Sequence, residues 1–154
     1  MLKLTIKENK ILKKALTDPV TYRQPIDGFL RKAGFTVEGR AKKRAPVDTG
    51  RYRSSIKTEV QELRSIIGSN LVYAPFIEFG TRPHWPPLSA LQPWARRHGF
   101  PRGRTGAFLV ARAIARRGTK AQKVMTTSLK DSLGDIERLL KDTVRDIQRR
   151  FKSG

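Results

Sequence analysis

Residues 44–56, "RAPVDTGRYRSSI", separate a helical pattern upstream from a strand pattern downstream. Pro46 lacks the backbone N–H that would continue a helix, and Asp48 can accept backbone hydrogen bonds in a tight turn. Thr49 can cap the short turn that follows, and Gly50 can adopt a positive φ. These four residues predict a helix-to-strand corner, around which we expect the N-terminal half to fold.

The tripeptide Asp48-Thr49-Gly50 also carries the catalytic carboxylate of aspartic proteases, so this class of enzyme has to be tested against the surrounding residues. In such proteases the turn follows a buried apolar strand, and two turns meet so that two carboxylates share a proton. Here a basic helix end precedes Asp48 and Arg51 follows it. The few residues before "SIIGSN" leave no room for the sheet and flap between two such motifs. We therefore predict that Asp48 is not the catalytic carboxylate of a protease, and we assign no catalytic residue.

Hydrophobic periodicity predicts an α+β fold for the N-terminal half. Alternation in residues 2–7 indicates a first strand, and residues 9–16 show the spacing of a short helix. A helical stripe from residue 26 to Pro46 predicts a long helix, which its three glycines weaken and tertiary packing must hold. Residues 56–68 fit an antiparallel hairpin. The result is a small antiparallel sheet packed by a long helix.

The C-terminal half has a different character. Residues 81–94 contain four prolines in fourteen positions, which predicts an extended, stiff arm interrupted at most by one short helix at residues 88–97. Residues 106–118 indicate a helix with a basic face, and residues 135–151 a C-terminal amphipathic helix. We expect one domain over residues 1–154, with a core at 1–80, a proline-rich basic arm at 81–104 and a helical part at 105–154.

Composition narrows the functional classes. The 154 residues, 38% of them hydrophobic, suit one modest core. The chain has no cysteine, and His84 and His98 alone make a poor metal set, so we predict neither a metal nor a cofactor. No apolar run reaches the length of a membrane span, and no signal peptide is apparent. These features are typical of a soluble intracellular product without a membrane partner.

Charge points to an anionic counterpart. The chain has 33 Lys and Arg against 13 Asp and Glu, a net charge of +20, and between Phe79 and Lys130 there are eleven basic residues and no acidic one. A field of one sign and this strength favours nucleic acid or an acidic protein surface as partner. Trp85 and Trp94 fit either partner, because aromatic rings stack on bases and also anchor in protein grooves. A freestanding nucleic-acid-binding protein therefore stays an alternative.

The segment "VYAPFIEFGT" places an apolar cluster around a lone acid. We expect its members to enter the core, with subunit contact as the alternative: Tyr73, Phe76, Ile77 and Phe79. Glu78 is the last acid before the basic half, so we expect it to pair with Arg51, Arg53 or Arg82. Gly80 and Thr81 are expected to end the segment, with the glycine supplying the reversed φ of a helix C-terminus.

The segment "RAPVDTGRYRSSI", followed by "IIGSNLVYAPFIEFGT", resembles the signature of the HK97 gp10-like family of tailed-phage neck and tail-completion proteins. In that family an Ala-Pro-x-Asp-Thr-Gly-x-aromatic/Leu-Arg-x-Ser-Ile segment precedes Tyr-Ala-x-x-x-Glu-x-Gly-Thr. The later segments "RPHWPPLSALQPWARRHG" and "AIARRGTKA" resemble a long variant of the family. The similarity covers residues 26–140.

The resemblance implies a non-enzymatic structural subunit, made in the host cytoplasm, that assembles as a homo-oligomeric ring at the head–tail junction of the virion. The implied partners are the phage connector or stopper and the tail terminator or tube, and transient contact with genomic DNA stays open. For the subunit or partner interface we single out two tryptophans and the basic residues of the C-terminal half: Trp85, Trp94, Arg96, Arg97, Arg102, Arg104, Arg112, Arg116 and Arg117.

Overall fold

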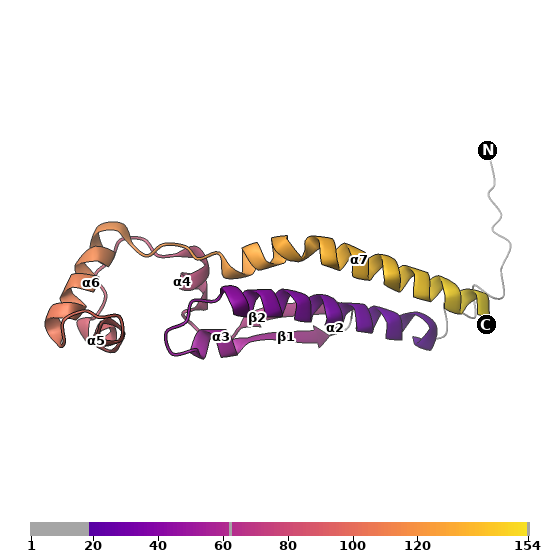
Figure 1. Ribbon diagram of the computed structural model, residues 1–154, viewed down its shortest axis with the longest axis horizontal. Coiled ribbons are helices and arrows are strands. Elements are labelled where there is room, and N and C mark those ends of the chain that lie inside the picture. The colour runs from indigo at the N-terminus through magenta and orange to yellow at the C-terminus, as the bar shows by residue number, and fades with distance from the viewer. Residues whose placement is uncertain (1–18, 62, 154) are drawn as a thin grey trace, which may run out of the picture.

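The computed structural model describes residues 19–61 and 63–153 and has an α+β fold (Figure 1). Helix α2 (Pro19–Arg44) lies between a two-stranded sheet and the long helix α7 (Val124–Ser153), and a second group of helices stands beyond one end of this body. The fold class predicted from the sequence is confirmed. The first strand and the short helix predicted at residues 2–7 and 9–16 lie outside the described residues.

Helix α2 contains the long helix predicted from residue 26 and begins earlier, at Pro19, a residue suited to a first helical turn. Its buried positions carry small side chains, among them Ala33 and Ala41. At Gly34 an added Cβ would lie 2.4 Å from side-chain atoms of both Thr58 and Ser65. This glycine weakens the isolated helix but lets it lie directly on the sheet.

The sheet is the predicted hairpin of β1 (Ile56–Gln61) and β2 (Arg64–Ser69), paired antiparallel from Ile56–Ser69 to Gln61–Arg64. A short helix, α3 (Arg51–Ser55), stands between the corner and β1. The hydrophobic core forms where these elements meet the start of α7. Its buried members are Ala41, Ala45, Tyr52, Ile56 and Val124.

Helix α7 contains the predicted C-terminal helix and begins earlier, at Val124. It packs along α2 through a narrow, partly polar face in which Ser128 and Ser132 are fully buried. Two ion pairs flank this contact, Arg40–Asp135 and Arg44–Asp131, each with an N–O distance of 2.5 Å. The small side chains on both helices allow their backbones to approach closely.

The prediction of an extended, proline-rich arm is not confirmed. After α4 (Ala74–Phe79), helices α5 (Leu88–Arg97) and α6 (Arg104–Arg117) pack against each other. Residues 80–87 and 118–123 connect this α5–α6 unit to the body (Figure 1). Three of the four prolines lie before α5, where they need no backbone donor, and buried Ala95, Ala107 and Ala111 supply the contact between helices.

Candidate assembly surfaces

The corner at residues 45–50 joins the body to the α5–α6 unit. Gly50 has a φ of +78° and precedes α3, whose start has no side-chain cap among the described residues. We expected Asp48 to accept backbone hydrogen bonds in this turn, but the hydrogen bonds of its side chain go to Arg97. Its Oδ1 and Oδ2 accept hydrogen bonds from Arg97 Nε and Nη2, at 2.7 and 2.6 Å. These hydrogen bonds hold the pKa of Asp48 below its usual value, so this carboxyl is ionised.

We expected Glu78 to pair with Arg51, Arg53 or Arg82. The structure contradicts this, because Glu78 caps the N-terminus of α7. Its side chain is 7% exposed. Oε2 accepts from the Met125 amide at 2.8 Å, and Oε1 accepts from the amide and hydroxyl of Thr126 at 2.9 and 2.7 Å. Burial acts to raise the pKa of Glu78, but these hydrogen bonds outweigh it and the pKa lies below its ordinary value. The helix N-terminus supplies the positive end that the carboxylate requires.

The two halves of the signature segment meet at this cap. Tyr52, from the first half, is buried in the core, and burial together with the negative charge of Glu78 raises the pKa of its hydroxyl. Ile77, from the second half, packs against the same core. The residues after α4 continue the contact, since the amides of Gln122 and Lys123 donate to the carbonyls of Ile77 and Glu78. The signature thus has a structural role, to fix the start of α7.

The two connectors of the α5–α6 unit cross at Thr81 and Thr119. Each backbone amide donates to the other residue's carbonyl, at 3.2 and 3.3 Å, and the two hydroxyl oxygens are 3.1 Å apart. Gly80 and Gly118 flank the crossing with φ of +72° and +68°. An added Cβ at Gly118 would lie 1.9 Å from the Thr81 carbonyl oxygen. Only glycine allows the connectors to approach this closely.

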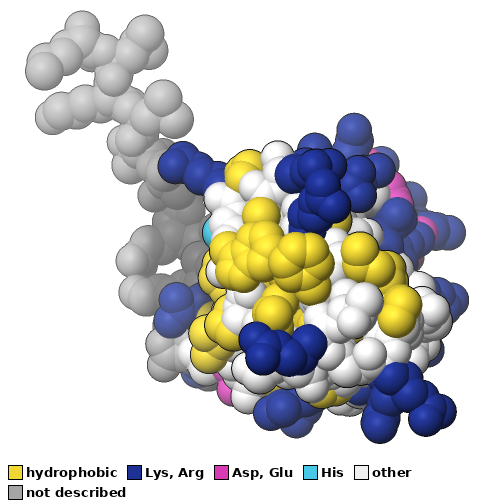
Figure 2. Space-filling model, turned by 90° about the vertical axis from the view of Figure 1, so that its left-hand side faces the viewer, with side chains coloured by type: hydrophobic (Ala, Val, Ile, Leu, Met, Phe, Trp, Pro, Cys, Tyr) yellow, Lys and Arg dark blue, Asp and Glu magenta, His cyan; other side chains and the backbone are white. Residues whose placement is uncertain are grey.

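The α5–α6 unit exposes aromatic side chains. Trp85 is 53% exposed and makes an edge-to-face contact with Phe108, and Trp94 stacks on His98 with ring centroids 4.0 Å apart. The His98 ring also lies 2.9 Å from the Trp94 carbonyl oxygen, at the end of α5. In the view onto this end of the molecule, hydrophobic side chains gather in the middle of the face with Lys and Arg around them (Figure 2).

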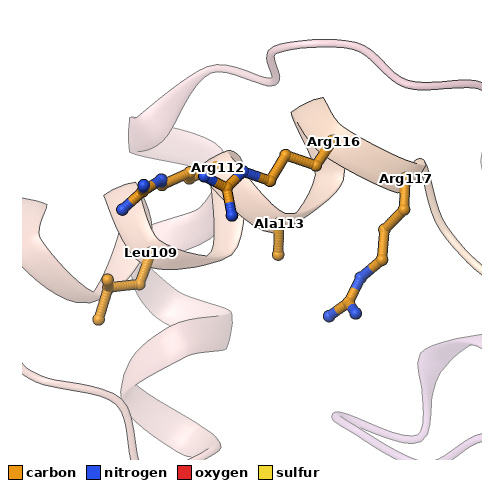
Figure 3. Close-up of a pocket in the computed structure, with 5 residues that line it drawn as sticks. All are labelled: Leu109, Arg112, Ala113, Arg116 and Arg117. Atoms are coloured by element: carbon orange, nitrogen blue, oxygen red, sulfur yellow. The ribbon is translucent and has the colours of Figure 1, made fainter.

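All seven arginines singled out from the sequence lie in or beside α5 and α6, but they differ in their contacts. Arg97 is held by Asp48. The side chains of the other six form no hydrogen bond or ion pair in the part of the chain that the structure describes: Arg96, Arg102, Arg104, Arg112, Arg116 and Arg117. Arg112, Arg116 and Arg117 line a shallow cleft together with Leu109 and Ala113 (Figure 3).

Helix α4 carries an apolar surface where the sequence predicted core. Ile77 packs against the core, but Tyr73, Phe76 and Phe79 are exposed, Phe79 by 75%. With six residues, α4 can bury only one face, and that face holds Ile77 and Glu78. The sequence did not reveal which apolar residues of α4 are buried, because apolar residues occur on all sides of this short helix.

A second apolar surface, the α7 stripe, was missed from the sequence. Its members lie at intervals of four and seven residues and are each about half exposed: Leu129, Leu133, Leu140 and Val144. The predicted amphipathic pattern is real, but its clearest apolar stripe does not coincide with the face on α2, which holds Ser128 and Ser132. Periodicity shows that a helix has an apolar side and does not show what covers it.

Within residues 19–61 and 63–153, no three His, Cys, Asp or Glu side chains gather in a way that could hold a metal ion. In the same residues, no helix has the length and apolar character needed to cross a membrane.

Comparison with known families agrees with the signature. A family model described as "Bacteriophage HK97-gp10, putative tail-component" matches residues 9–80, which include the first signature segment and the second up to Gly80, with Tyr52 and Glu78. No curated protein and no solved structure was found to match the chain. The match supports a bacteriophage tail component, a protein of the virion. Residues 9–80 of the chain thus match the HK97 gp10-like family, which supports the resemblance seen in the sequence.

Proposed function

We propose that this tail component is a non-enzymatic neck or tail-completion subunit, which forms a ring of identical copies at the head–tail junction and joins the connector to the tail. The observation that carries the proposal is the exposed apolar surface of the described chain. Aromatic or aliphatic side chains stand exposed on α4, on the α5–α6 unit and along α7. Exposed apolar patches on several elements of a small protein are typical of a subunit built for assembly.

The shape of the molecule supports the same function. The α5–α6 unit stands beyond the body on two connectors that cross at Thr81 and Thr119 (Figure 1). It can therefore reach a neighbouring subunit while the core around Tyr52 stays intact. A contact in which one end of a subunit meets a different surface of the next is heterologous, and such contacts close into rings when the rotation permits.

The test is the position and state of the protein in virions. We expect cross-linking and labelled electron microscopy to place it at the head–tail junction in several copies. Phe79→Ser should reduce its incorporation, because α4 then loses apolar contact area. Phe35→Ser is the matched control, since Phe35 is also a highly exposed phenylalanine but lies on α2. Equal incorporation of both variants would remove α4 from the interface, and a location elsewhere in the virion would overturn the neck assignment.

Tryptophan fluorescence gives a second readout. Trp85 and Trp94 are both exposed in the subunit. In the isolated protein we expect red-shifted, readily quenched emission, and in the assembled particle we expect protection from quenching. Equal quenching in both states would mean that the α5–α6 unit takes no part in assembly.

A further inference from the structure

The α6 cleft, formed by Leu109, Arg112, Ala113, Arg116 and Arg117, has the features of a binding site. It is an open cleft of about 270 Å³, and all of its lining residues come from one face of α6. In Figure 3, the side chains of Arg112 and Arg116 run along the helix, whereas Leu109, Ala113 and Arg117 project to one side of it. Cationic groups thus border a small apolar floor.

The three arginines of the α6 cleft are available to an external ligand. None of their side chains forms a hydrogen bond or ion pair in the described chain, and all three side chains are exposed. The segment between Phe79 and Lys130 has no acidic residue, and Asp48, which reaches the α5–α6 unit from outside this segment, is bonded to Arg97 instead. Arg112 and Arg116 are one helical turn apart, so their charges act on the same ligand. Guanidinium groups bind carboxylates through paired, charge-assisted hydrogen bonds.

The apolar floor favours a peptide over a nucleic acid. Leu109 is 44% exposed, and Ala113 is half-buried beside it. A phosphate backbone gains nothing from an apolar surface, whereas an aliphatic side chain buried there gains the hydrophobic free energy of the covered area. The ligand that uses both parts of the cleft carries carboxylates next to an aliphatic side chain.

A second copy of this chain does not offer such a segment among its described residues. Seven carboxylates already accept hydrogen bonds from Arg, Lys or Thr side chains or from backbone amides: Glu38, Asp48, Glu78, Asp131, Asp135, Asp142 and Asp146. Glu59 accepts from Gln61. Asp27 and Glu137 have no partner in the described chain, but they lie on different helices, α2 and α7. Neither helix presents two free carboxylates one turn apart.

We propose that the α6 cleft binds an acidic segment of another virion protein, with an aliphatic side chain on Leu109 and Ala113 and carboxylates on Arg112, Arg116 and Arg117. This inference rests on the proposed function only in placing the partner in the virion. The recognition itself is a property of the isolated subunit and can be measured there.

The first test compares two variants of equal charge. The probe is a labelled helical peptide with two glutamates one turn apart and a leucine on the same face. Its binding to the full chain is followed by fluorescence anisotropy. We expect the triple variant R112Q/R116Q/R117Q to weaken binding by about tenfold or more, because each arginine contributes a charge-assisted contact. R96Q/R102Q/R104Q removes the same charge from unpaired arginines outside the cleft, and we expect less than about a threefold change. Equal losses in both would show a general field and overturn the site.

The second test separates the apolar floor from the charges. Replacing the peptide's leucine with serine should weaken binding, and so should Leu109→Gln in the protein. Leu140→Gln is the control, because Leu140 is 47% exposed but lies on α7. If neither the leucine-to-serine change in the peptide nor Leu109→Gln weakens binding, the proposal of a peptide ligand is wrong. A short DNA duplex that binds more tightly than the peptide, and loses affinity selectively in R112Q/R116Q/R117Q, would assign the cleft to nucleic acid instead.

A further outcome distinguishes this inference from the ring. If the protein self-associates and R112Q/R116Q/R117Q alone abolishes this association, the cleft contacts a second copy and our choice of partner is wrong. If the cleft binds the peptide as expected but the protein is absent from the head–tail junction, the proposed function fails and the binding site stands.

Discussion

The position of Glu78 is explained by a part of the chain that is distant in sequence, the start of α7. Helix α7 begins after Lys123, which has a φ of +49° and cannot cap the helix with a side-chain oxygen. The first amides of a helix need acceptors, and here the carboxylate of Glu78 supplies them across 47 and 48 residues of sequence. Charge alone suggested an arginine partner. The helix N-terminus competes successfully because it offers several aligned donors in a buried position.

We expect Glu78→Gln to lower the free energy of unfolding by about 1–3 kcal/mol at neutral pH. Glutamine has one acceptor oxygen where glutamate has two, so one of the donors at the start of α7 loses its acceptor. The folded pKa of Glu78 is depressed, so its contribution is present above the unfolded pKa and is lost as pH falls through the folded value. Urea unfolding should therefore separate wild type from Glu78→Gln near neutral pH and bring them together in acid. Glu137→Gln, at an exposed residue, should match wild type throughout. A constant gap at all pH values would contradict the charged cap.

Gly118 tests the crossing of the two connectors. We expect Gly118→Ala to break the Thr81–Thr119 pairing, since the new methyl group would meet the Thr81 carbonyl oxygen. Hydrogen exchange at the amides of both threonines should rise. Gly99→Ala is the control for backbone strain, because Gly99 has a φ of +77° and nothing within 4 Å of an added Cβ. Its cost should be about 1 kcal/mol of local strain without faster exchange at the crossing. Equal protection in all three proteins would mean that the crossing tolerates a side chain.

Among the helices and strands, the sequence predicted those whose position is set by hydrophobic periodicity over neighbouring residues. The long helix, the hairpin and the C-terminal helix all appear, because their apolar spacing and turn signals lie within a few residues. The helices predicted at residues 88–97 and 106–118 are present as α5 and α6, but the sequence did not reveal that they pack against each other. Four prolines suggested an extended arm, but Pro93 lies inside α5 and contacts between alanines hold α5 against α6. Alanine contacts carry no periodic signal that distinguishes them from an exposed helical face.

The link between the α5–α6 unit and the body leads to a prediction for Asp48. We expect Asp48→Asn to leave the core unchanged and to increase the range of distances between unit and body, because Asn cannot hold Arg97 by two charged hydrogen bonds. The chain has no cysteine, so cysteines introduced at exposed Ser89 and Gln61 can carry a fluorescent pair.

The energy-transfer distribution should broaden in Asp48→Asn and stay narrow in Asp142→Asn. Asp142 also pairs with an arginine, Arg145, but within α7, so its loss leaves the attachment of the unit intact. A narrow distribution in both variants would assign the attachment to the Thr81–Thr119 crossing alone.

For the molecule as a whole, the fold class could be predicted from the sequence, but the exposure of its apolar side chains could be predicted only in part. Hydrophobic periodicity indicated an α+β fold, which the structure has, and the signature indicated a phage family whose model matches residues 9–80. The sequence could not show that Phe76 and Phe79 face outward, or that the α7 stripe lies apart from α2. For the α7 stripe the reason is the contact between α2 and α7, because small residues such as Ala41 and Ser132 are buried there. Leu129 and Leu133 lie beside this contact, on a surface that we assign to assembly.

The net charge of +20 sets the last expectation, the response of self-association to salt. Identical subunits in a ring bring like charges together, and the Debye length of about 8 Å at physiological salt leaves close arginine contacts unscreened. We expect the isolated protein to be mainly monomeric at low salt and to associate more as salt rises, because screening leaves the apolar contacts of α4 and α7. An acidic neighbour should produce the same association without added salt. Light scattering over a salt series, with and without a neighbouring connector or tail protein, measures both effects.

A stable ring from the isolated subunit at low salt would show that repulsion does not govern assembly. Assembly on duplex DNA without any effect of the neighbour would make nucleic acid the neutralising partner.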